Sequence, residues 1–171
     1  PVLAITGTNG KTTVTALTGH LLRSAGVDCE VAGNIAPPVL DAALRRSAAP
    51  VAWVLELSSY QLETTWSLKP HAAAMLNLTE DHLDRYASIE EYGAAKARIF
   101  ADAGVQVLNR HDPRSMGMAR PGAKVVTFGL DDDDYGVRGG ALVCRGVPML
   151  RIDELQIHGS HNVANALAAC A

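Results

Sequence analysis

The stretch VLAITGTNGKTT, residues 2–13, decides the fold class. Residues 2–6 form an apolar run of strand length, and residues 11–25 follow with the spacing of an amphipathic helix. The turn between them is built from glycine, asparagine, lysine and threonine. A polar glycine turn between a strand and a helix gathers backbone N–H groups at the positive end of the helix dipole. This arrangement binds phosphate.

The turn departs from the strict Walker A pattern, because Ile5 stands where that pattern has its first glycine. The mechanism of the motif is still available: Gly7 and Gly10 free the backbone to turn its amides toward an anion. Lys11 would reach the terminal phosphates, and the hydroxyl of Thr12 would reach Mg²⁺. An ordinary glycine-rich turn ahead of a helix is the alternative interpretation.

Composition bounds the classes of partner. The chain has 171 residues, of which 48% are hydrophobic, and this length favours one domain with one core. A formal net charge of −3 excludes a global positive field, so we expect neither nucleic acid nor a membrane surface as a partner. The three cysteines are far apart and unpaired in sequence, which fits a reducing, cytoplasmic setting. No apolar run is long enough to predict a membrane span.

Strand-like runs alternate with helical patterns along most of the chain, which predicts an α/β fold: a mostly parallel sheet flanked by helices, with a P-loop-like mononucleotide site. The strands are expected at 2–6, 51–57, 71–77, 105–109 and 124–129, and the helices at 11–25, 36–47, 88–103, 112–119 and 162–171. Short pieces between 131 and 157 predict a small antiparallel meander. The chain opens on a buried strand and stops inside a helix, so we expect one domain of a longer protein.

An acidic residue lies at the end of the strand in VAWVLELSSYQLE, residues 51–63. Burying the carboxylate of Glu56 there is costly unless it is paired or bound to a metal. The carboxyl ends of parallel strands are also where ligands of α/β proteins bind. Glu56 is therefore a candidate metal ligand, and an exposed acid at a strand end is the alternative.

The next strand runs into LNLTEDHLDRY, which brings Asp81, His82 and Asp84 to the same edge of the sheet. Mg²⁺ prefers oxygen ligands, so a histidine ligand would be unusual, and His82 could instead be a structural hydrogen-bonding residue. Its position on the same edge as Lys11 and Glu56 favours a role at the metal.

A lysine lies on the core side of the helix SIEEYGAAKARIFADA. Lys96 shares a stripe of helical period with Tyr92 and Ile99, so its ammonium is expected at a buried position. The plain alternative is a buried stem with the ammonium reaching water. Burial near other cations lowers the pKa of a lysine, and the neutral amine reacts with CO₂ to form a carbamate that supplies an oxygen anion for a metal.

Six segments in collinear order resemble the central ATPase domain of Mur ligases, and most closely the group that adds D-glutamate. These segments are TGTNGKTT at 6–13, GNI at 33–35, LELSSYQLE at 55–63, NLTEDHLDRY at 77–86, YGAAKARI at 92–99 and GSHNVANALAA at 159–169. One departure is that Ala36-Pro37-Pro38 follows GNI, where the family pattern continues with another glycine.

The resemblance implies a role for each matching residue. Lys11 would contact the β and γ phosphates of ATP. The rest of the phosphate cradle would be Gly7, Thr8, Asn9, Gly10, Thr12 and Thr13. Two Mg²⁺ ions would be held by Thr12, Glu56, His82 and a carbamylated Lys96. Asn34 and Ser58 would face the muramoyl substrate, and Asn162 and Asn165 would hold the adenine end of the nucleotide. Without the resemblance, the two asparagines read as surface residues in the first turn of a helix.

The implied reaction joins D-glutamate to UDP-MurNAc-L-alanine. The substrate carboxylate attacks the γ-phosphate of ATP to give an acyl phosphate and ADP, and the amine of D-glutamate then displaces phosphate. The chain would be the central domain of a monomeric three-domain enzyme, without its N-terminal uridine-nucleotide-binding and C-terminal amino-acid-binding domains. By itself it would bind nucleotide without full activity. Two alternatives stay open: a Mur-type ligase that adds another amino acid, and a P-loop module that binds nucleotide without catalysis.

Overall fold

β1 (Val2–Thr6) lies near the middle of a six-stranded parallel sheet in the computed structural model, which describes residues 1–81 and 84–171. The strand order is β2-β3-β1-β4-β5-β6, and all five pairings are parallel. The other strands of this sheet are β2 (Cys29–Gly33), β3 (Ala52–Glu56), β4 (Ala72–Met75), β5 (Val105–Asn109) and β6 (Lys124–Phe128). The predicted α/β class is confirmed.

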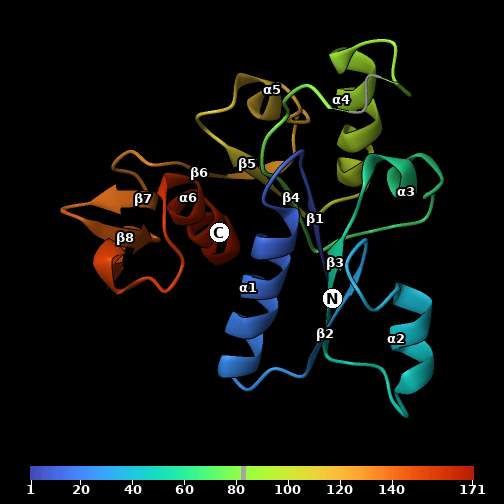
Figure 1. The fold of residues 1–171 in the computed structure, drawn as a ribbon, viewed down its shortest axis with the longest axis horizontal. Helices are drawn as coiled ribbons and strands as arrows, with labels where there is room; N and C mark the ends of the chain where they lie inside the picture. The colour runs from blue at the N-terminus through green and yellow to red at the C-terminus, as the bar shows by residue number, and fades with distance from the viewer. Residues whose placement is uncertain (82–83) are drawn as a thin grey trace.

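Helices cover both faces of this sheet (Figure 1). One face carries α1 (Lys11–Ser24) and α6 (Ser160–Cys170), which pack side by side. The other face carries α2 (Val39–Arg45), α3 (Ser59–Glu63), α4 (Ile89–Ala97) and α5 (Pro113–Met116). Two short 3₁₀ helices, η1 (Arg98–Phe100) and η2 (Ile152–Glu154), complete the helical elements of the described residues. Of these helices, none is both long and apolar enough to cross a membrane.

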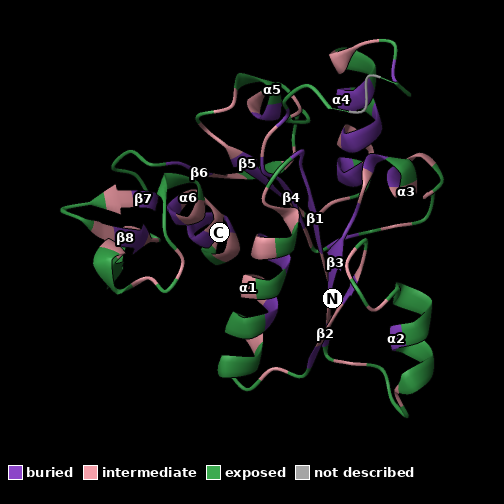
Figure 2. Ribbon diagram, viewed as in Figure 1, coloured by how far each residue is buried: buried purple, intermediate pink, exposed green. Residues whose placement is uncertain are grey.

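Successive residues of a strand point to opposite faces of the sheet and pack into two separate cores. In β1, Ala4 packs into the cluster beneath α2 and α3, while Ile5 packs into the cluster beneath α1 and α6. Figure 2 shows the central strands of the sheet largely buried and the outer faces of α1 and α2 exposed. Because both faces are covered, the strands read in sequence as continuous apolar runs rather than as alternating ones.

The predicted meander is a separate three-stranded antiparallel sheet of β7 (Tyr135–Arg138), β8 (Ala141–Cys144) and β9 (Val147–Arg151). Both of its hairpin turns use residues with positive φ, which suits the twist of a two-residue connection. Gly139 and Gly140 have φ of 56° and 75°, and Arg145 and Gly146 have φ of 53° and 75°. The last predicted piece, residues 155–157, forms no strand.

β2 and α3 were not predicted, and three helices are shorter than expected, among them the one expected at 112–119, which spans only Pro113–Met116 as α5. β2 contains a glutamate and ends in glycine, so its apolar signal is weak. α3 has only five residues and depends on a capping box between Ser58 and Gln61. The helix expected at 36–47 begins only at Val39, after Pro37 and Pro38. The one expected at 88–103 is helical as α4 to residue 97 and continues as η1.

The strand order places a ligand site beside β1. The chain leaves β1 toward β2 and β3 on one side and later adds β4, β5 and β6 on the other. Such a switch point leaves a crevice at the carboxyl ends of the strands, where α/β proteins bind ligands. The glycine turn after β1 lies at this point.

Leu108 in β5 tests the core beneath α2 to α5, since it is fully buried at 0% exposure. We expect Leu108→Ala to lower the free energy of unfolding by about 2–5 kcal/mol, because it removes buried methyl groups and leaves a cavity. Leu44 is 75% exposed on α2, so Leu44→Ala should change it by less than about 0.5 kcal/mol. Urea denaturation of both variants measures the difference, and equal losses would contradict the packing described here.

Candidate nucleotide and metal site

The turn between β1 and α1 requires its glycines. Gly10 is the N-cap of α1 and has φ of 83°, in the left-handed region that favours glycine. A Cβ atom at Gly10 would lie 2.5 Å from Oδ1 of Asn165 on α6. One at Gly7 would lie 3.0 Å from Cβ of Leu76. The turn therefore passes close to α6 and to the residue that follows β4. A side chain at Gly7 or Gly10 would displace the turn.

The segment after β4 holds the turn in place. The backbone N–H of Thr8 donates to the carbonyl oxygen of Asn77 over 3.0 Å. The backbone N–H of Asn9 donates to the side-chain Oδ1 atom of Asn77 over 2.8 Å. The backbone N–H of Thr79 donates to the hydroxyl of Thr8 over 3.1 Å. The amides of Thr8 and Asn9 are thus used within the protein. The N–H groups of the first turn of α1, from Lys11 onward, are those left without intrahelical partners and able to meet an anion.

Two lysines donate to one carbonyl oxygen. The Nζ atom of Lys11 lies 3.0 Å from the carbonyl oxygen of Gly7, and Nζ of Lys96 lies 2.9 Å from the same oxygen. Lys11 donates a second bond to the carbonyl of Thr8 over 2.9 Å. Lys96 is only 1% exposed, so the prediction that it faces the core is confirmed. The two ammonium groups are therefore close neighbours at the base of the turn.

Burial and mutual repulsion act on both amines. Desolvation, together with the positive charge of Lys11, lowers the pKa of Lys96 to about 7, and Asp81 opposes this shift. Burial also lowers the pKa of Lys11, while the carboxylates of Glu56 and Asp81 oppose that change. Of these two amines, Lys96 is therefore the one whose charge changes near neutral pH.

Glu56 lies at the end of β3 with 2% exposure, which is the buried position expected from the sequence. Its Oε2 atom accepts the hydroxyl of Thr12 over 2.9 Å, and its Oε1 atom accepts the side-chain amide of Asn34 over 2.9 Å. Both of these donors are neutral. The positive charge of Lys11 offsets part of the cost of burying this carboxylate, and a bound cation would offset more of it.

The oxygen donors around Glu56 suit Mg²⁺, which prefers carboxylate and hydroxyl ligands and retains water. Thr12 and Glu56 present such oxygens side by side. Within residues 1–81 and 84–171, no three His, Cys, Asp or Glu side chains come together as a metal cluster. His82, the remaining predicted ligand, lies outside the described residues.

The other predicted residues lie around the same turn or on elements that adjoin it. Thr13 is half-buried in the first turn of α1. Ser58 caps α3, where its hydroxyl accepts the N–H of Gln61 over 3.2 Å. On α6, Asn165 donates to Asn162 over 3.2 Å, and its side chain adjoins Gly10. The structure thus brings Asn165 to the phosphate turn, with Asn162 bonded to it from the preceding turn of α6.

Sequence reasoning missed Asn77 and Thr79, which fix the turn. Their signal was available, because both are polar residues placed directly after a buried strand at the ligand-binding edge. Their contacts, however, join the segment after β4 to a turn about 70 residues earlier in the chain, as with the pair Thr8 and Thr79. A pattern along the sequence does not encode such a pairing.

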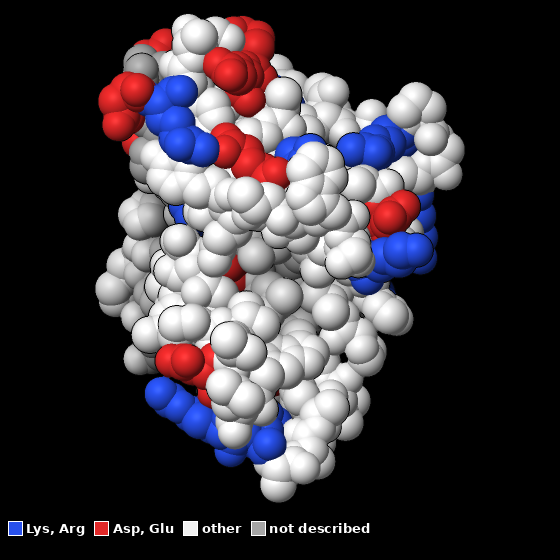
Figure 3. Space-filling model, turned by 90° about the vertical axis from the view of Figure 1, so that its right-hand side faces the viewer, with Lys and Arg blue, Asp and Glu red and all other residues white. Residues whose placement is uncertain are grey.

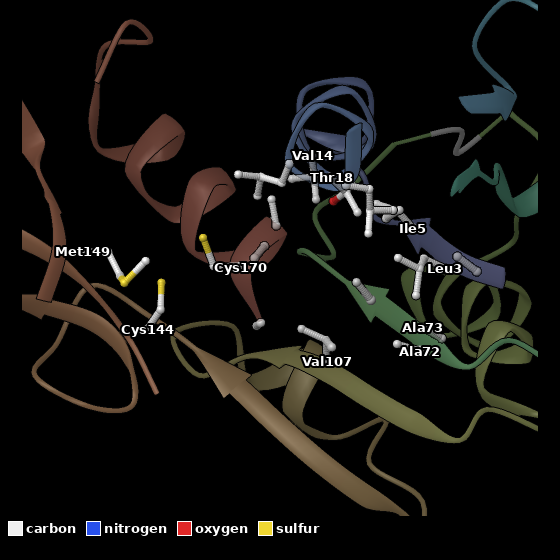
Figure 4. A pocket seen from close by; sticks show the side chains of 17 residues that line it. Leu3, Ile5, Val14, Thr18, Ala72, Ala73, Val107, Cys144, Met149 and Cys170 are labelled. Atoms are coloured by element: carbon white, nitrogen blue, oxygen red, sulfur yellow. The ribbon is translucent and has the colours of Figure 1, made fainter. Parts of the chain in front are cut away.

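An apolar pocket lies elsewhere, beside α1 and α6. Figure 4 shows a pocket between α1, α6 and the sheet, with Val14, Val107 and Cys170 among its lining side chains. None of the predicted site residues lines it. Figure 3 shows the face that carries α2, α3 and α4, where charges of both signs gather mainly toward the two ends. That face presents no continuous basic surface of the kind that holds nucleic acid.

A parallel sheet with a glycine turn between its central strand and a helix, beside a buried carboxylate, defines an α/β domain of the P-loop-like mononucleotide-binding class. The family model described as Mur ligase middle domain matches residues 5–171. The chain belongs to the Mur ligase family, and the resemblance based on the six sequence segments is confirmed.

Two relatives share the name UDP-N-acetylmuramoylalanine--D-glutamate ligase. The protein of Thiobacillus denitrificans is 55% identical over 178 residues, which span 99% of this chain and 38% of that protein. The protein of Nitrosomonas europaea is 54% identical over 185 residues, spanning 99% of this chain and 39% of that protein. The chain thus spans about two fifths of the length of these relatives.

Solved structures share the fold. A UDP-N-acetylmuramoyl-L-alanyl-D-glutamate--2,6-diaminopimelate ligase superposes with a TM-score of 0.80 at 27% identity, covering 98% of this chain and 42% of that one. A MurF ligase from Thermotoga maritima in complex with ADP gives a TM-score of 0.69 at 18% identity, covering 99% and 44%. The second likeness shows the fold alone.

The pKa of Lys96 predicts a pH-dependent stability. Below about pH 7 the folded protein must hold a buried ammonium, whereas between pH 7 and 10.5 only the unfolded chain carries that charge. The unfolded state then binds more protons, so wild-type stability rises with pH across this window. Lys96→Met removes the charge and should raise Tm relative to wild type. We expect this increase in Tm to be largest near pH 6.5 and to be smaller by on the order of 5 °C at pH 9.5.

Thermal unfolding in CO₂-depleted buffer without nucleotide or metal measures this difference. Lys69 is exposed, so Lys69→Met is the matched control and should show no such pH dependence. A Tm difference between Lys96→Met and wild type that stays constant from pH 6.5 to 9.5 would rule out a depressed pKa at Lys96.

Proposed function

We propose that this chain is the ATP-binding domain of an amide-bond ligase of peptidoglycan precursor synthesis, which adds D-glutamate to UDP-MurNAc-L-alanine. One observation carries the proposal: Lys11 and Lys96 share the Gly7 carbonyl at the N-terminus of α1, beside the buried carboxylate of Glu56. While Lys96 is an ammonium, the two cations repel each other, and an anion between them relieves the repulsion. A polyphosphate is the anion that fits a helix N-terminus.

Different residues would bind different parts of the nucleotide. Lys11 and the free N–H groups of Thr12 and Thr13 would hold the β and γ phosphates, with Gly7, Thr8, Asn9 and Gly10 shaping the turn that cradles them. Asn162 and Asn165 would hold the adenine end, which is supported by the position of Asn165 against Gly10. In a phosphoryl transfer these contacts act by positioning and by stabilising charge rather than through a covalent bond to the protein.

The magnesium ligands are part of the same proposal. Mg²⁺ bound at this site would neutralise charge on the phosphate and acyl oxygens. Thr12 and Glu56 would hold it, and Asn34 orients the Glu56 carboxylate. His82 as a further ligand rests on the sequence alone. A neutral Lys96 amine would add CO₂, and its carbamate would supply an oxygen ligand to the second of two ions.

The substrate side of the site lies toward β2 and α3. Asn34 follows β2 and Ser58 caps α3, and both flank Glu56. We propose that they face the muramoyl substrate, whose alanine carboxylate must reach the γ-phosphate. The carboxylate attacks that phosphorus, the bond to ADP breaks, and the amine of D-glutamate then displaces phosphate from the acyl carbon.

The wider protein is part of the proposal. The relatives are more than twice as long as this chain, which supports a central domain flanked by a uridine-nucleotide-binding and an amino-acid-binding domain. The domain alone would bind nucleotide without full activity, because closure of flanking domains commonly completes such sites. We propose a cytoplasmic monomer, since the UDP-linked precursor and ATP are cytoplasmic metabolites.

Two alternatives differ in measurable ways. A Mur-type ligase that adds another amino acid would keep every contact above, and the names of the relatives argue for D-glutamate. A module that binds nucleotide without catalysis would have no need of the buried Glu56 and Lys96. Both residues are costly to bury, so their presence favours an enzyme.

Phosphate release by the full-length parent protein tests the reaction. With Mg·ATP and UDP-MurNAc-L-alanine, we expect release that depends on D-glutamate, because only its amine completes the turnover. L-lysine, diaminopimelate and no amino acid serve as parallel controls. Release with one of those amino acids instead would move the protein to another branch of the family, and no release at all would favour the binding module.

Lys11→Ala tests the site itself. Losing the ammonium that faces the terminal phosphates should lower kcat/KM in the parent enzyme about 100-fold or more. Lys69→Ala removes an exposed lysine elsewhere and should leave the rate unchanged. If Lys11→Ala kept wild-type turnover, the assignment of the phosphate turn would be wrong.

A further inference from the structure

Three tyrosine rings form a column between α3 and α4. The rings of Tyr60 and Tyr86 are stacked with centroids 6.3 Å apart, and those of Tyr86 and Tyr92 are tilted with centroids 5.2 Å apart. Tyr60 belongs to α3, Tyr92 belongs to α4, and Tyr86 comes from the segment between them. Such ring pairs stabilise through both buried area and geometry.

Glu63, the last residue of α3, fixes the middle ring. Its Oε1 atom accepts the hydroxyl of Tyr86 over 2.6 Å, and its Oε2 atom accepts Nη2 of Arg85 over 2.5 Å. The guanidinium of Arg85 in turn lies 4.8 Å from the centroid of Tyr60. One carboxylate thus sets the positions of two consecutive residues against α3, and the hydrogen bonds from Tyr86 and Arg85 hold the pKa of Glu63 below its usual value.

The column ends at the phosphate turn. Nζ of Lys96 lies 4.6 Å from the centroid of Tyr92 and 2.9 Å from the carbonyl oxygen of Gly7. Tyr92 and Lys96 are each 1% exposed. The ammonium is shielded from solvent, so the ring and the carbonyl help to fix where it lies, and the carboxylate of Asp81 also attracts it.

We propose that Glu63 is a positioning residue for the Lys96 amine: by holding Tyr86 and Arg85, it sets the tyrosine column that supports Lys96 against the phosphate turn. The inference deepens the proposed function and rests on it. Glu63 itself is separated from the turn by the column, so it acts through other residues. The segment from Glu56 to Glu63 then serves the site twice, through the Glu56 carboxylate and through the support of Lys96.

A purely structural tie between the two helices is the competing explanation. Arg98 makes such a tie, because its Nε atom donates to the carbonyl of Leu62 over 2.7 Å and Nη2 donates to that of Thr65 over 3.2 Å. Its guanidinium stacks 4.3 Å from the ring of Trp66, and its positive charge also acts on the carboxylate of Glu63. Arg98→Met is therefore a control that loosens the α3 contact and removes a charge near Glu63 while leaving both hydrogen bonds of Glu63 in place.

The experiment uses the full-length parent enzyme with Glu63→Leu, Glu63→Gln, Tyr86→Phe, their combinations and Arg98→Met. Glu63→Leu should lower kcat about tenfold with KM for UDP-MurNAc-L-alanine within about twofold, because the misplaced amine affects the transfer rather than substrate binding. Glu63→Gln keeps an acceptor for Tyr86 and should recover part of the loss. Adding Tyr86→Phe to Glu63→Leu should cost less than the sum of the two single losses, since both remove the bond between Glu63 and Tyr86, while Tyr86→Phe also removes a contact with Ser59.

A second readout is independent of turnover. Trace acetylation of lysines in CO₂-depleted buffer, mapped by mass spectrometry, should label Lys96 about threefold faster in Glu63→Leu than in wild type, because the buried amine loses its fixed place. Arg98→Met should leave both kcat and Lys96 labelling within about twofold of wild type.

The outcomes separate the two proposals. Unchanged kcat and labelling in Glu63→Leu, or equal effects from Arg98→Met, would overturn the positioning role. Additive losses in Glu63→Leu with Tyr86→Phe would do the same. Faster Lys96 labelling in a parent protein that does not use D-glutamate would support the positioning of Lys96 while the proposed reaction fell.

Discussion

The carbonyl oxygen of Gly7 is the point on which the site depends, because it accepts both Lys11 and Lys96. One neutral oxygen does not balance two ammonium groups, so the remaining field at the start of α1 favours an anion. Burial sharpens the effect, since it removes the water that would otherwise screen the two charges. The turn is thus an anion site before any ligand arrives.

The order of the strands makes this arrangement possible. β1 leads into Gly7 and lies between β3, which ends at Glu56, and β4, which leads to Asn77. Adjacent parallel strands deliver their carboxyl ends to one edge, so a cation-binding carboxylate and an anion-binding turn come to lie side by side. Lys96 reaches the same place from a helix on one face of the sheet, while the asparagines of α6 approach from the other.

The sequence predicted what local pattern controls. Apolar runs marked five of the six parallel strands, and helical spacing placed Lys96 on the buried side of α4. It missed β2 and α3, because one is a short strand with a charged residue and the other a single capped turn. The clamp of Asn77 on Asn9 and the tyrosine column were also missed, since they join residues that only the fold brings together. The sequence indicated which residue types form the site, but it did not indicate the contacts that position them.

The charge state of Lys96 decides what the site attracts. As an ammonium it repels Lys11 and opposes a metal cation near Glu56. As a neutral amine, which its depressed pKa favours above about pH 7, it no longer does either. As the proposed carbamate it would attract Lys11 and add a negative oxygen beside Glu56, so one side chain would turn a site suited to anions alone into one suited to a metal and a polyphosphate together. A buried lysine is a costly residue in a fold, and this change of sign gives a physical reason to place one here.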